Sequence, residues 1–321
     1  MLSEFDLIAR YFDRPAPAPA QVVLGIGDDC ALVRPAANMQ LAVSSDMLVE
    51  GRHFFPDVDP QSLGHKCLAV NLSDLAAMGA QPLGFTLALS LPAADESWLS
   101  GFSSGLLALA DMHACPLVGG DTTRGPLNIC ITVFGEVPPG QALRRDAAQI
   151  DDDIWISGAL GDARLALAAK LDEVELEGAD LARALPRLLQ PVPRVALGLA
   201  LRGIAHAAID LSDGLAGDLA HILKRSGVGA VLEVDAIPAG PALAAQGDNH
   251  RRAFVLAGGD DYELCFTAPR GRREDVLAAG RAADTPVTRV GSICEGGGLR
   301  LIDAAGQALS LSLQSFDHFR S

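Results

Sequence analysis

The sequence lacks the features that direct a protein into a membrane or a secreted, disulfide-stapled fold. It contains no apolar run of about 18 residues, and its N-terminus has no basic region followed by an apolar one. Its six cysteines are scattered and form no C-x-x-C pair, which favours reduced thiols over disulfides or a zinc site. We therefore expect a cytoplasmic protein without a membrane partner.

Basic residues are also in the minority. The chain has 25 Lys and Arg against 40 Asp and Glu, giving a net charge of -15. Nucleic acid and anionic membranes require a basic surface, so neither is expected as a partner. ATP remains compatible, because bound Mg²⁺ offsets acidic charge. With 321 residues, 49% of them hydrophobic, the chain is long enough for about two domains.

What the sequence does contain is a set of aspartate-rich clusters, each with glycine or a hydroxyl residue alongside. Most follow an apolar, strand-like run, and carboxylates at strand ends are typical ligands of Mg²⁺, often shared with phosphates. If the clusters converge, they form a multi-metal site for nucleotide phosphates, which indicates phosphoryl transfer. The clusters are Gly27-Asp28-Asp29, Ser44-Ser45-Asp46, Asn71-Leu72-Ser73-Asp74, Gly119-Gly120-Asp121, Asp210-Leu211-Ser212-Asp213-Gly214 and Gly258-Gly259-Asp260-Asp261.

Periodicity predicts strands mixed with helices in both halves, so we expect an α/β or α+β protein. Pro138-Pro139-Gly140 is the predicted boundary between domains 1–138 and 139–321. The pattern predicts helices at 2–12, 63–78, 96–112, 163–171 and 215–225, and strands at 41–43, 84–91, 116–118, 127–137, 154–157, 207–210, 230–234, 254–256 and 262–267.

Each cluster alone also has an ordinary structural explanation. Asp and Gly together are common in turns, and Ser212 or Asp213 is positioned to cap a helix starting near Leu215. Capping does not explain two carboxylates and a hydroxyl at one helix N-terminus, a position that favours phosphate. Asn71 and Asp74 share one face of an apolar helix, where an unpartnered carboxylate is costly and a metal ligand is favoured.

Two basic positions leave both explanations open. His53 follows Gly51-Arg52 in a loop and, by itself, is typical of a surface histidine. Arg144 and Arg145 are either a solvated pair or arginines that neutralise ATP phosphates. No H-E-x-x-H string and no kinase-type H-R-D or D-F-G string is present, so those mechanisms find no support.

In this order, the clusters closely resemble the thiamine-monophosphate kinase family. The resemblance runs from Glu4-Phe5-Asp6 to Phe316-Asp317-His318-Phe319 and includes Asn71–Gly79 and the string Gly258–Leu264. It implies a two-domain, aminoimidazole ribonucleotide synthetase-like fold, with an N-terminal dimerising, ATP- and Mg²⁺-binding domain. The implied enzyme is a homodimer that transfers the γ-phosphoryl group of ATP to thiamine monophosphate in thiamine diphosphate biosynthesis.

The resemblance also assigns roles to individual residues. Catalysis is assigned to Asp29, Asp74, Asp121 and Asp210; ATP contacts to Gly120, Asp121, Arg145 and Ser212; thiamine monophosphate contacts to His53, Asp260 and Phe316. The implied Mg²⁺ ligands are Asp29, Ser44, Ser45, Asp46, Asp74, Asp121, Asp210 and Asp213.

Two positions depart from the family pattern. Threonine is usual where Ser45 stands, and a hydroxyl or carbonyl ligand survives that change. Glutamate is usual where Asp260 stands, so the charge is kept but one methylene of reach is lost. The alternatives are a sibling such as aminoimidazole ribonucleotide synthetase, or a nucleotide sensor that binds Mg-ATP without turnover.

Overall fold

Residues 4–14 and 19–311 are described by the computed structural model, in which the chain divides into two units. Unit 1 comprises Met1–Leu75 and Ala80–Gly140, and unit 2 comprises Ala76–Gly79 and Gln141–Ser321. The main division thus falls between Gly140 and Gln141, two residues after the predicted boundary. None of the described helices is long and apolar enough to cross a lipid bilayer.

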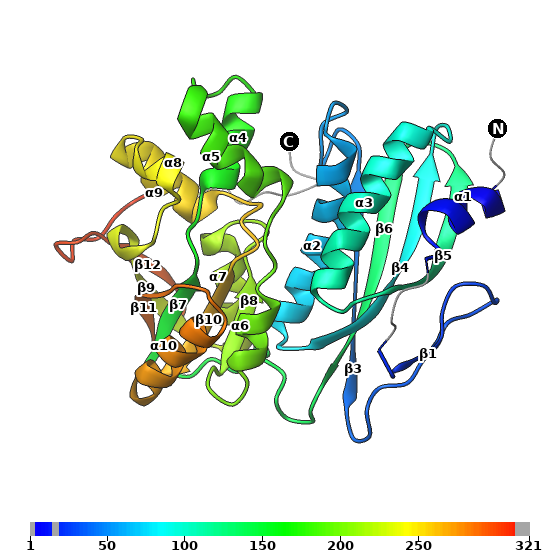
Figure 1. Ribbon diagram of the computed structural model, residues 1–321. Helices are drawn as coiled ribbons and strands as arrows, with labels where there is room; N and C mark the ends of the chain where they lie inside the picture. Colours follow the sequence, from blue (N-terminus) through cyan, green and yellow to red (C-terminus); the bar gives the residue numbers. More distant parts are fainter. Residues whose placement is uncertain (1–3, 15–18, 312–321) are drawn as a thin grey trace. The chain divides into compact units, whose positions relative to one another are not determined.

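Unit 1 is built on a four-stranded sheet in the order β3-β6-β4-β5, with helices α2 and α3 on one face (Figure 1). Strands β4 and β5 run parallel, whereas β6 is antiparallel to both of its neighbours. The elements are α1 (Glu4–Tyr11), β1 (Val22–Leu24), β2 (Leu32–Val33), β3 (Gln40–Val49), α2 (Pro60–Ala77), β4 (Gln81–Leu91), α3 (Glu96–Met112), β5 (Leu117–Arg124) and β6 (Asn128–Val137).

Glycines bring α2 and α3 into close contact. A Cβ atom at Gly64 would lie 2.0 Å from the carbonyl oxygen of Phe102, and one at Gly105 would lie 1.8 Å from that of Gln61. The string Gly101-Phe102-Ser103-Ser104-Gly105 has the G-x-S-x-G spacing of hydrolase nucleophiles, but it lies inside α3 and not at a strand-to-helix turn. Its glycines therefore serve helix packing.

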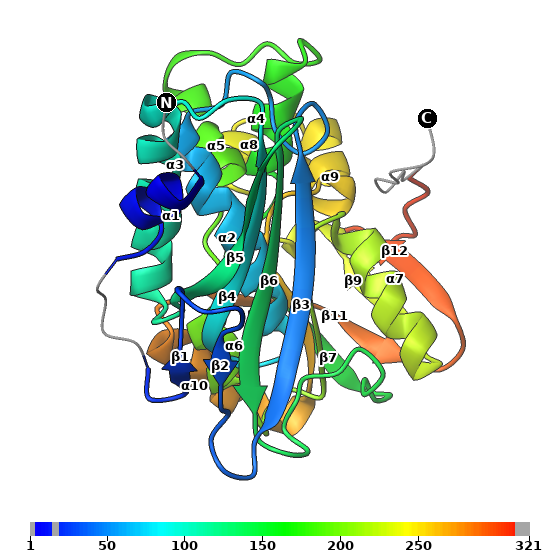
Figure 2. The same ribbon diagram turned by 90° about the vertical axis from the view of Figure 1, so that its right-hand side faces the viewer.

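Within residues 4–14 and 19–311, no helix lies over the other face of the unit 1 sheet (Figure 2). Side chains alternate along β3, so Ser44, Asp46 and Leu48 point to the helix side. On the open face, Leu41, Val43 and Met47 are 50%, 56% and 54% exposed. An apolar row on an edge strand is unusual for a surface that stays in water.

Unit 2 contains a six-stranded mixed sheet in the order β12-β9-β11-β7-β10-β8. Its elements are β7 (Asp152–Ser157), α4 (Asp162–Lys170), α5 (Gly178–Leu189), α6 (Val195–Ala200), β8 (Ala207–Asp210), α7 (Leu215–Ser226), β9 (Gly229–Glu233), η1 (Val234–Ala236), α8 (Pro241–Ala244), α9 (Asp248–Ala257), β10 (Leu264–Pro269), η2 (Arg270–Arg272), α10 (Arg273–Ala282), β11 (Val287–Cys294) and β12 (Gly298–Ile302).

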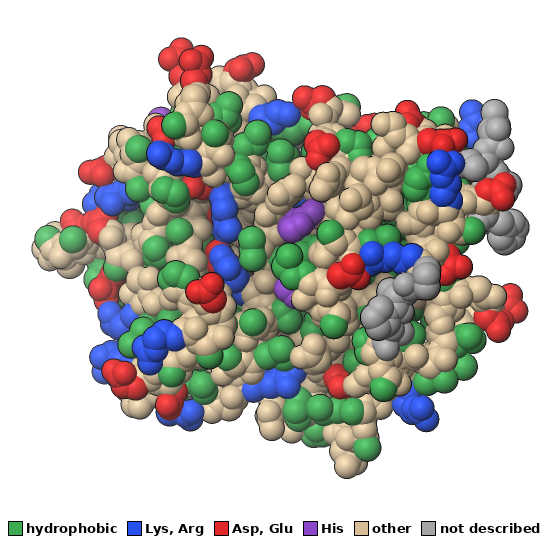
Figure 3. Space-filling model, in the orientation of Figure 1, with side chains coloured by type: hydrophobic (Ala, Val, Ile, Leu, Met, Phe, Trp, Pro, Cys, Tyr) green, Lys and Arg blue, Asp and Glu red, His purple; other side chains and the backbone are tan. Residues whose placement is uncertain are grey.

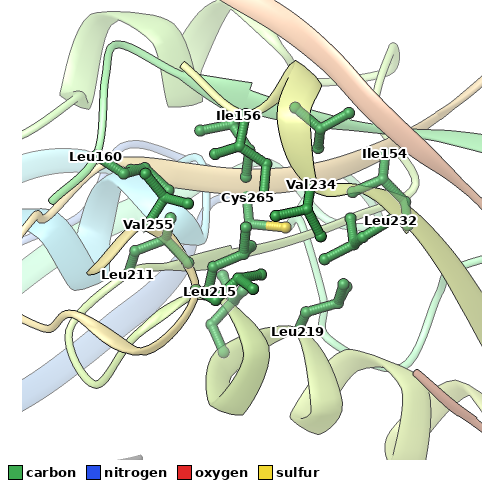
Figure 4. Packing of buried hydrophobic residues seen from close by; sticks show 14 of the residues in the cluster. Ile154, Ile156, Leu160, Leu211, Leu215, Leu219, Leu232, Val234, Val255 and Cys265 are labelled. Atoms are coloured by element: carbon green, nitrogen blue, oxygen red, sulfur yellow. The ribbon is translucent and has the colours of Figure 1, made fainter. Parts of the chain in front are cut away.

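The core of unit 2 lies between this sheet and helices such as α7. Figure 4 shows Cys265 of β10 directed into the cluster, between Ile156 of β7 and Leu215 of α7. Burial raises the pKa of the Cys265 thiol well above its usual range, so this cysteine is a packing residue. On the face displayed in Figure 3, Lys and Arg side chains are interspersed with Asp and Glu and form no continuous basic surface.

Three local predictions were wrong. The strand predicted at 254–256 is the C-terminal part of helix α9, because a three-residue apolar run does not distinguish a strand from a buried helix turn. Strands predicted to end at 43 and 118 continue to Val49 and Arg124. Pairing of β3 with β6, and of β5 with β4 after a register shift at Val118, extends both strands past Asp46 and Asp121, which are therefore mid-strand.

Candidate active site

In unit 1, the predicted ligands on β3 and α2 are joined by hydrogen bonds. Ser44 Oγ donates to Asp74 Oδ2 over 2.5 Å, and the Asp46 N–H donates to Asn71 Oδ1 over 3.1 Å. Asn71 is fully buried, and its Nδ2 donates to the carbonyl oxygen of Cys67 over 2.9 Å. The three-residue spacing of Asn71 and Asp74 therefore presents both side chains to the same strand.

Ser45 lies on the opposite face of β3. Its Oγ donates to the carbonyl oxygen of Ile131 over 3.1 Å and lies 3.0 Å from Thr132 Oγ1. Because side chains alternate along a strand, this hydroxyl is separated by the sheet from Ser44 and Asp46. A metal shared with those two residues would meet only the main-chain carbonyl of Ser45.

Asp29 and Asp121 are exposed and come from separate places in unit 1. Asp29 lies in the loop between β1 and β2, where its N–H donates to Asp28 Oδ1 over 2.8 Å. Beside Asp121, Gly120 has φ +152°, and a Cβ there would lie 1.9 Å from the carbonyl oxygen of Leu87. Strand packing by itself therefore requires glycine at 120.

His53 is held in a defined orientation after β3. Its Nδ1 accepts a hydrogen bond from the Val49 N–H over 3.0 Å. An accepting Nδ1 carries no proton, so the neutral ring has its proton on Nε2. This atom is then a donor.

In unit 2, the loop after β8 and the loop before β10 are paired along their main chains. Asp210 ends β8 and pairs with Leu264. Beyond the strands, the Leu211 N–H donates to the carbonyl oxygen of Glu263, the Tyr262 N–H to that of Leu211 and the Asp260 N–H to that of Ser212, over 2.8 to 3.0 Å. Two predicted site segments, 210–214 and 258–263, are thus brought together.

The predicted cap of α7 was wrong. The N-cap residue is Gly214 without a side-chain hydrogen bond, because the carboxylate of Asp218 reaches back from the first turn instead. Its Oδ2 accepts from the N–H groups of Asp213 and Gly214, each over 3.1 Å. Burial and the nearby charge of Asp213 raise the pKa of Asp218 to about 7, and these two hydrogen bonds and the charge of Arg145 oppose the shift.

Sequence reasoning missed Asp218 and also the buried Glu263. Asp218 is visible in the sequence as an acidic residue in the first turn of a helix. Such residues are common, because they interact favourably with the helix dipole, so its position alone does not indicate a role in holding the loop. Glu263 gave no signal, since its partners lie far away in the sequence.

The donors fit Mg²⁺ by type, although only part of the predicted ligand set is assembled. Within unit 1, Ser44, Asp46 and Asp74 supply hydroxyl and carboxylate oxygens on one side of β3, and Mg²⁺ prefers such oxygen ligands. Among residues 4–14 and 19–311, no group of three or more His, Cys, Asp or Glu side chains lies close enough to hold a metal ion. Phe316 lies outside the described residues.

Comparisons with known proteins identify the family of this chain. Residues 27–137 match the model of the AIR synthase related protein N-terminal domain, and residues 149–304 match the C-terminal domain. The thiamine-monophosphate kinase of Salmonella typhimurium is 46% identical over 98% of both chains. The crystal structure of the Stenotrophomonas maltophilia K279a enzyme of the same name is 49% identical, with a TM-score of 0.84 over 90% of this chain and 93% of that one.

A third protein was solved with bound ligands. It is described as AaThiL complexed with AMPPCP and TMP, and it is 28% identical, with a TM-score of 0.78 over 89% of each chain. Identity of 46% over nearly the full length is sufficient to establish kinship. The chain therefore belongs to the thiamine-monophosphate kinase family of AIR synthase related proteins.

Proposed function

We propose that this chain transfers the γ-phosphoryl group of ATP to thiamine monophosphate and so forms thiamine diphosphate, in thiamine diphosphate biosynthesis. The observation that carries the proposal is the 46% identity to a thiamine-monophosphate kinase over 98% of the chain. The relative in complex with AMPPCP, an ATP analogue, and TMP supports the same pair of substrates.

The reaction is a direct in-line transfer without a phosphoenzyme. The attacking phosphate oxygen is ionised near neutral pH, so no general base is required, and the protein has to hold two anionic groups in line. The Ser44 hydrogen bond orients the Asp74 carboxylate towards this task. Mg²⁺ would neutralise phosphate charge when bound. Its proposed ligands are Asp29, Ser44, the carbonyl of Ser45, Asp46, Asp74, Asp121, Asp210 and Asp213.

Substrate contacts follow from the donors and charges available. The Nε2–H of His53 is suited to donate to an oxygen of thiamine monophosphate, and Asp260 is suited to its cationic ring. Phe316 is proposed to stack on an aromatic ring of thiamine. For ATP, the proposed contacts are Gly120, Asp121, Arg145 and Ser212.

The open face of the unit 1 sheet supports a homodimer. Leu41, Val43 and Met47 form an exposed apolar row there, and a second copy of the chain would remove this row from water. ATP as co-substrate and six cysteines without disulfides support a cytoplasmic location.

The proposed function is tested by product formation. Purified protein is incubated with ATP and MgCl₂, and either thiamine monophosphate or free thiamine, and the products are separated by chromatography. We expect thiamine diphosphate from the monophosphate only, and none after EDTA is added. Folded protein that binds ATP but makes no product from either substrate would contradict the proposal and favour a sibling activity or a nucleotide sensor.

A further inference from the structure

A buried carboxylate bound by two arginines lies at the base of the paired loops of unit 2. Glu263 has no exposed surface. Arg194 binds it through both Nε and Nη2, over 2.6 and 2.5 Å, and Arg187 Nη2 donates to its Oε1 over 2.7 Å. Ser157 Oγ donates to Oε2 over 2.6 Å. Each carboxylate oxygen therefore accepts two hydrogen bonds.

These bonds join four separate segments of unit 2. Glu263 directly precedes β10, Ser157 ends β7, Arg187 belongs to α5 and Arg194 precedes α6. The space is fitted to this side chain, because a Cβ at Gly158 would lie 2.2 Å from Glu263 Oε1. Gly158 also has φ +58°, so a side chain there is disfavoured twice.

The same cluster is continuous with the loops that carry the predicted site residues. The carbonyl oxygen of Glu263 accepts the Leu211 N–H, next to Asp210. Arg187 also reaches the carbonyl oxygen of Asp261 over 3.5 Å, and Asp261 Oδ1 accepts the Gly161 N–H over 2.8 Å.

The loop between these anchors is conformationally unfavourable by itself. Asp260 and Tyr262 have φ +64° and +49°, in the left-handed region that most side chains avoid. Such a backbone persists only where its surroundings fix it. Glu263 and its two arginines hold the loop from one side, and the hydrogen bond from the Asp260 N–H to the carbonyl oxygen of Ser212 holds it from the other.

Stability alone does not account for this arrangement. Burying the Glu263 carboxylate and most of the two arginine side chains, which are 24% and 15% exposed, costs desolvation. Well-packed apolar residues often stabilise a fold as well. We propose that Glu263, Arg187 and Arg194 are positioning residues that hold Asp260 and the 210–214 loop in their working geometry. The proposal rests on the proposed function. It adds that substrate affinity depends on side chains that do not touch the substrate.

The test uses a matched pair of substitutions within unit 2. Arg194→Lys keeps the charge but loses the two-pronged contact with Glu263. The control is Arg273→Lys, because Arg273 likewise binds a fully buried carboxylate, Asp153, through Nε and Nη2, alongside Arg289 as a second arginine. Asp153 pairs with Ala268 and Ser292 in the sheet, away from the two loops.

We expect both variants to lose thermal stability, and Arg194→Lys the more, because the Arg194 side chain is 15% exposed and the Arg273 side chain 48%. Only Arg194→Lys should raise the KM for thiamine monophosphate, by about tenfold. The reason is that Asp260 and the 210–214 loop are then held less firmly. Equal KM values in both variants would overturn the proposal. If Arg194→Lys does not fold, Arg187→Lys takes its place with the same expectations.

A second readout separates this inference from the proposed function. The rise in thermal midpoint on adding MgCl₂ with AMPPCP needs no turnover, and it should need more MgCl₂ in Arg194→Lys than in Arg273→Lys. Wild-type protein that makes no thiamine diphosphate would contradict the proposed function, whereas equal MgCl₂ dependence in the two variants would contradict the positioning role.

Discussion

The two units hold their candidate site residues by different means. In unit 1, Ser44, Asp46 and Asp74 stand on a strand and a helix, and a hydroxyl and the amide of Asn71 hold them. In unit 2, the residues stand on loops that are tied down by main-chain pairing, the Asp218 carboxylate and the Glu263 cluster. The hydrogen bonds of a helix or a sheet fix the residues that it carries, whereas loop residues need additional contacts to fix them. We therefore expect activity to be lost in unit 1 when a proposed ligand itself is substituted. In unit 2, we expect it to be lost also when a residue that holds the loops is substituted.

The largest expected effect is on turnover after Asp74→Asn. The amide still accepts the Ser44 hydrogen bond, so folding should be preserved, but the negative charge is lost. We expect kcat to fall by about a hundredfold or more, as when an electrostatic contact is removed from other active sites. Steady-state kinetics and thermal unfolding measure the two quantities.

The matched control for this substitution is Asp59→Asn at the start of the same helix. Asp59 accepts from the N–H and Oγ of Ser62, which is a capping role. The asparagine amide oxygen can still accept these bonds, so losing the charge at the helix N-terminus should lower stability only slightly and leave turnover near wild type. A folded Asp74→Asn protein with an unchanged rate would remove Asp74 from the site.

Two neighbouring glycines of β5 test whether strand packing requires glycine at position 120. Gly120→Ala introduces a Cβ 1.9 Å from the carbonyl oxygen of Leu87 at φ +152°, and it should lower the free energy of unfolding by about 2 kcal/mol or more. Gly119→Ala places its Cβ 3.8 Å from Thr86 Cγ2, in ordinary contact, and should be tolerated in stability. Urea denaturation compares them; equal stabilities would contradict the structural explanation of Gly120.

The open sheet face gives a test of association that leaves unit 2 untouched. Val43→Asp places a charge in the exposed apolar row and should weaken the proposed dimer by about tenfold or more. Val192→Asp alters a similarly exposed valine of unit 2, 45% exposed, and should leave the dimer intact. Analytical ultracentrifugation over a concentration series measures both. A dimer that survives Val43→Asp unchanged would exclude this face.

The smallest expected effect concerns acid stability of unit 2. Burial opposes ionisation of Asp153, but hydrogen bonds from Arg273 and Arg289 outweigh it and hold its pKa below the ordinary value. A depressed carboxyl pKa stabilises the fold above the unfolded pKa of about 4, and this contribution disappears as the pH falls through the folded pKa.

Urea denaturation at pH 6 and pH 3 measures this contribution in wild type and in Asp153→Asn. The difference in unfolding free energy between them should be smaller at pH 3, by about 1 kcal/mol. A difference that does not change with pH would mean that the arginines leave the titration of Asp153 unaltered.

The sequence predicted what is local and missed what is not. The 96–112 helix, the strand end at Asp210 and the shared face of Asn71 and Asp74 follow from periodicity, and each is confirmed. Because side chains alternate along a strand, Ser45 faces the opposite side of the sheet from Ser44 and Asp46. This could have been predicted from the sequence spacing alone. The pairing of Ser212 with Asp260 depends on the order of strands in the sheet. The partners of Glu263 come from three distant segments. Residue spacing in the sequence therefore predicts neither set of contacts.

The position of β7 also has a consequence for how the chain folds during synthesis. The partners of β7, strands β10 and β11, are not complete until Pro269 and Cys294, while all six β7 residues are buried in the finished sheet. At typical elongation rates, β7 waits on the order of ten seconds for these neighbours. The four strands of the β3-β6-β4-β5 sheet in unit 1, by contrast, are complete at Val137. We therefore expect the nascent chain to expose unpaired, apolar strand surface for longer in unit 2 than in unit 1.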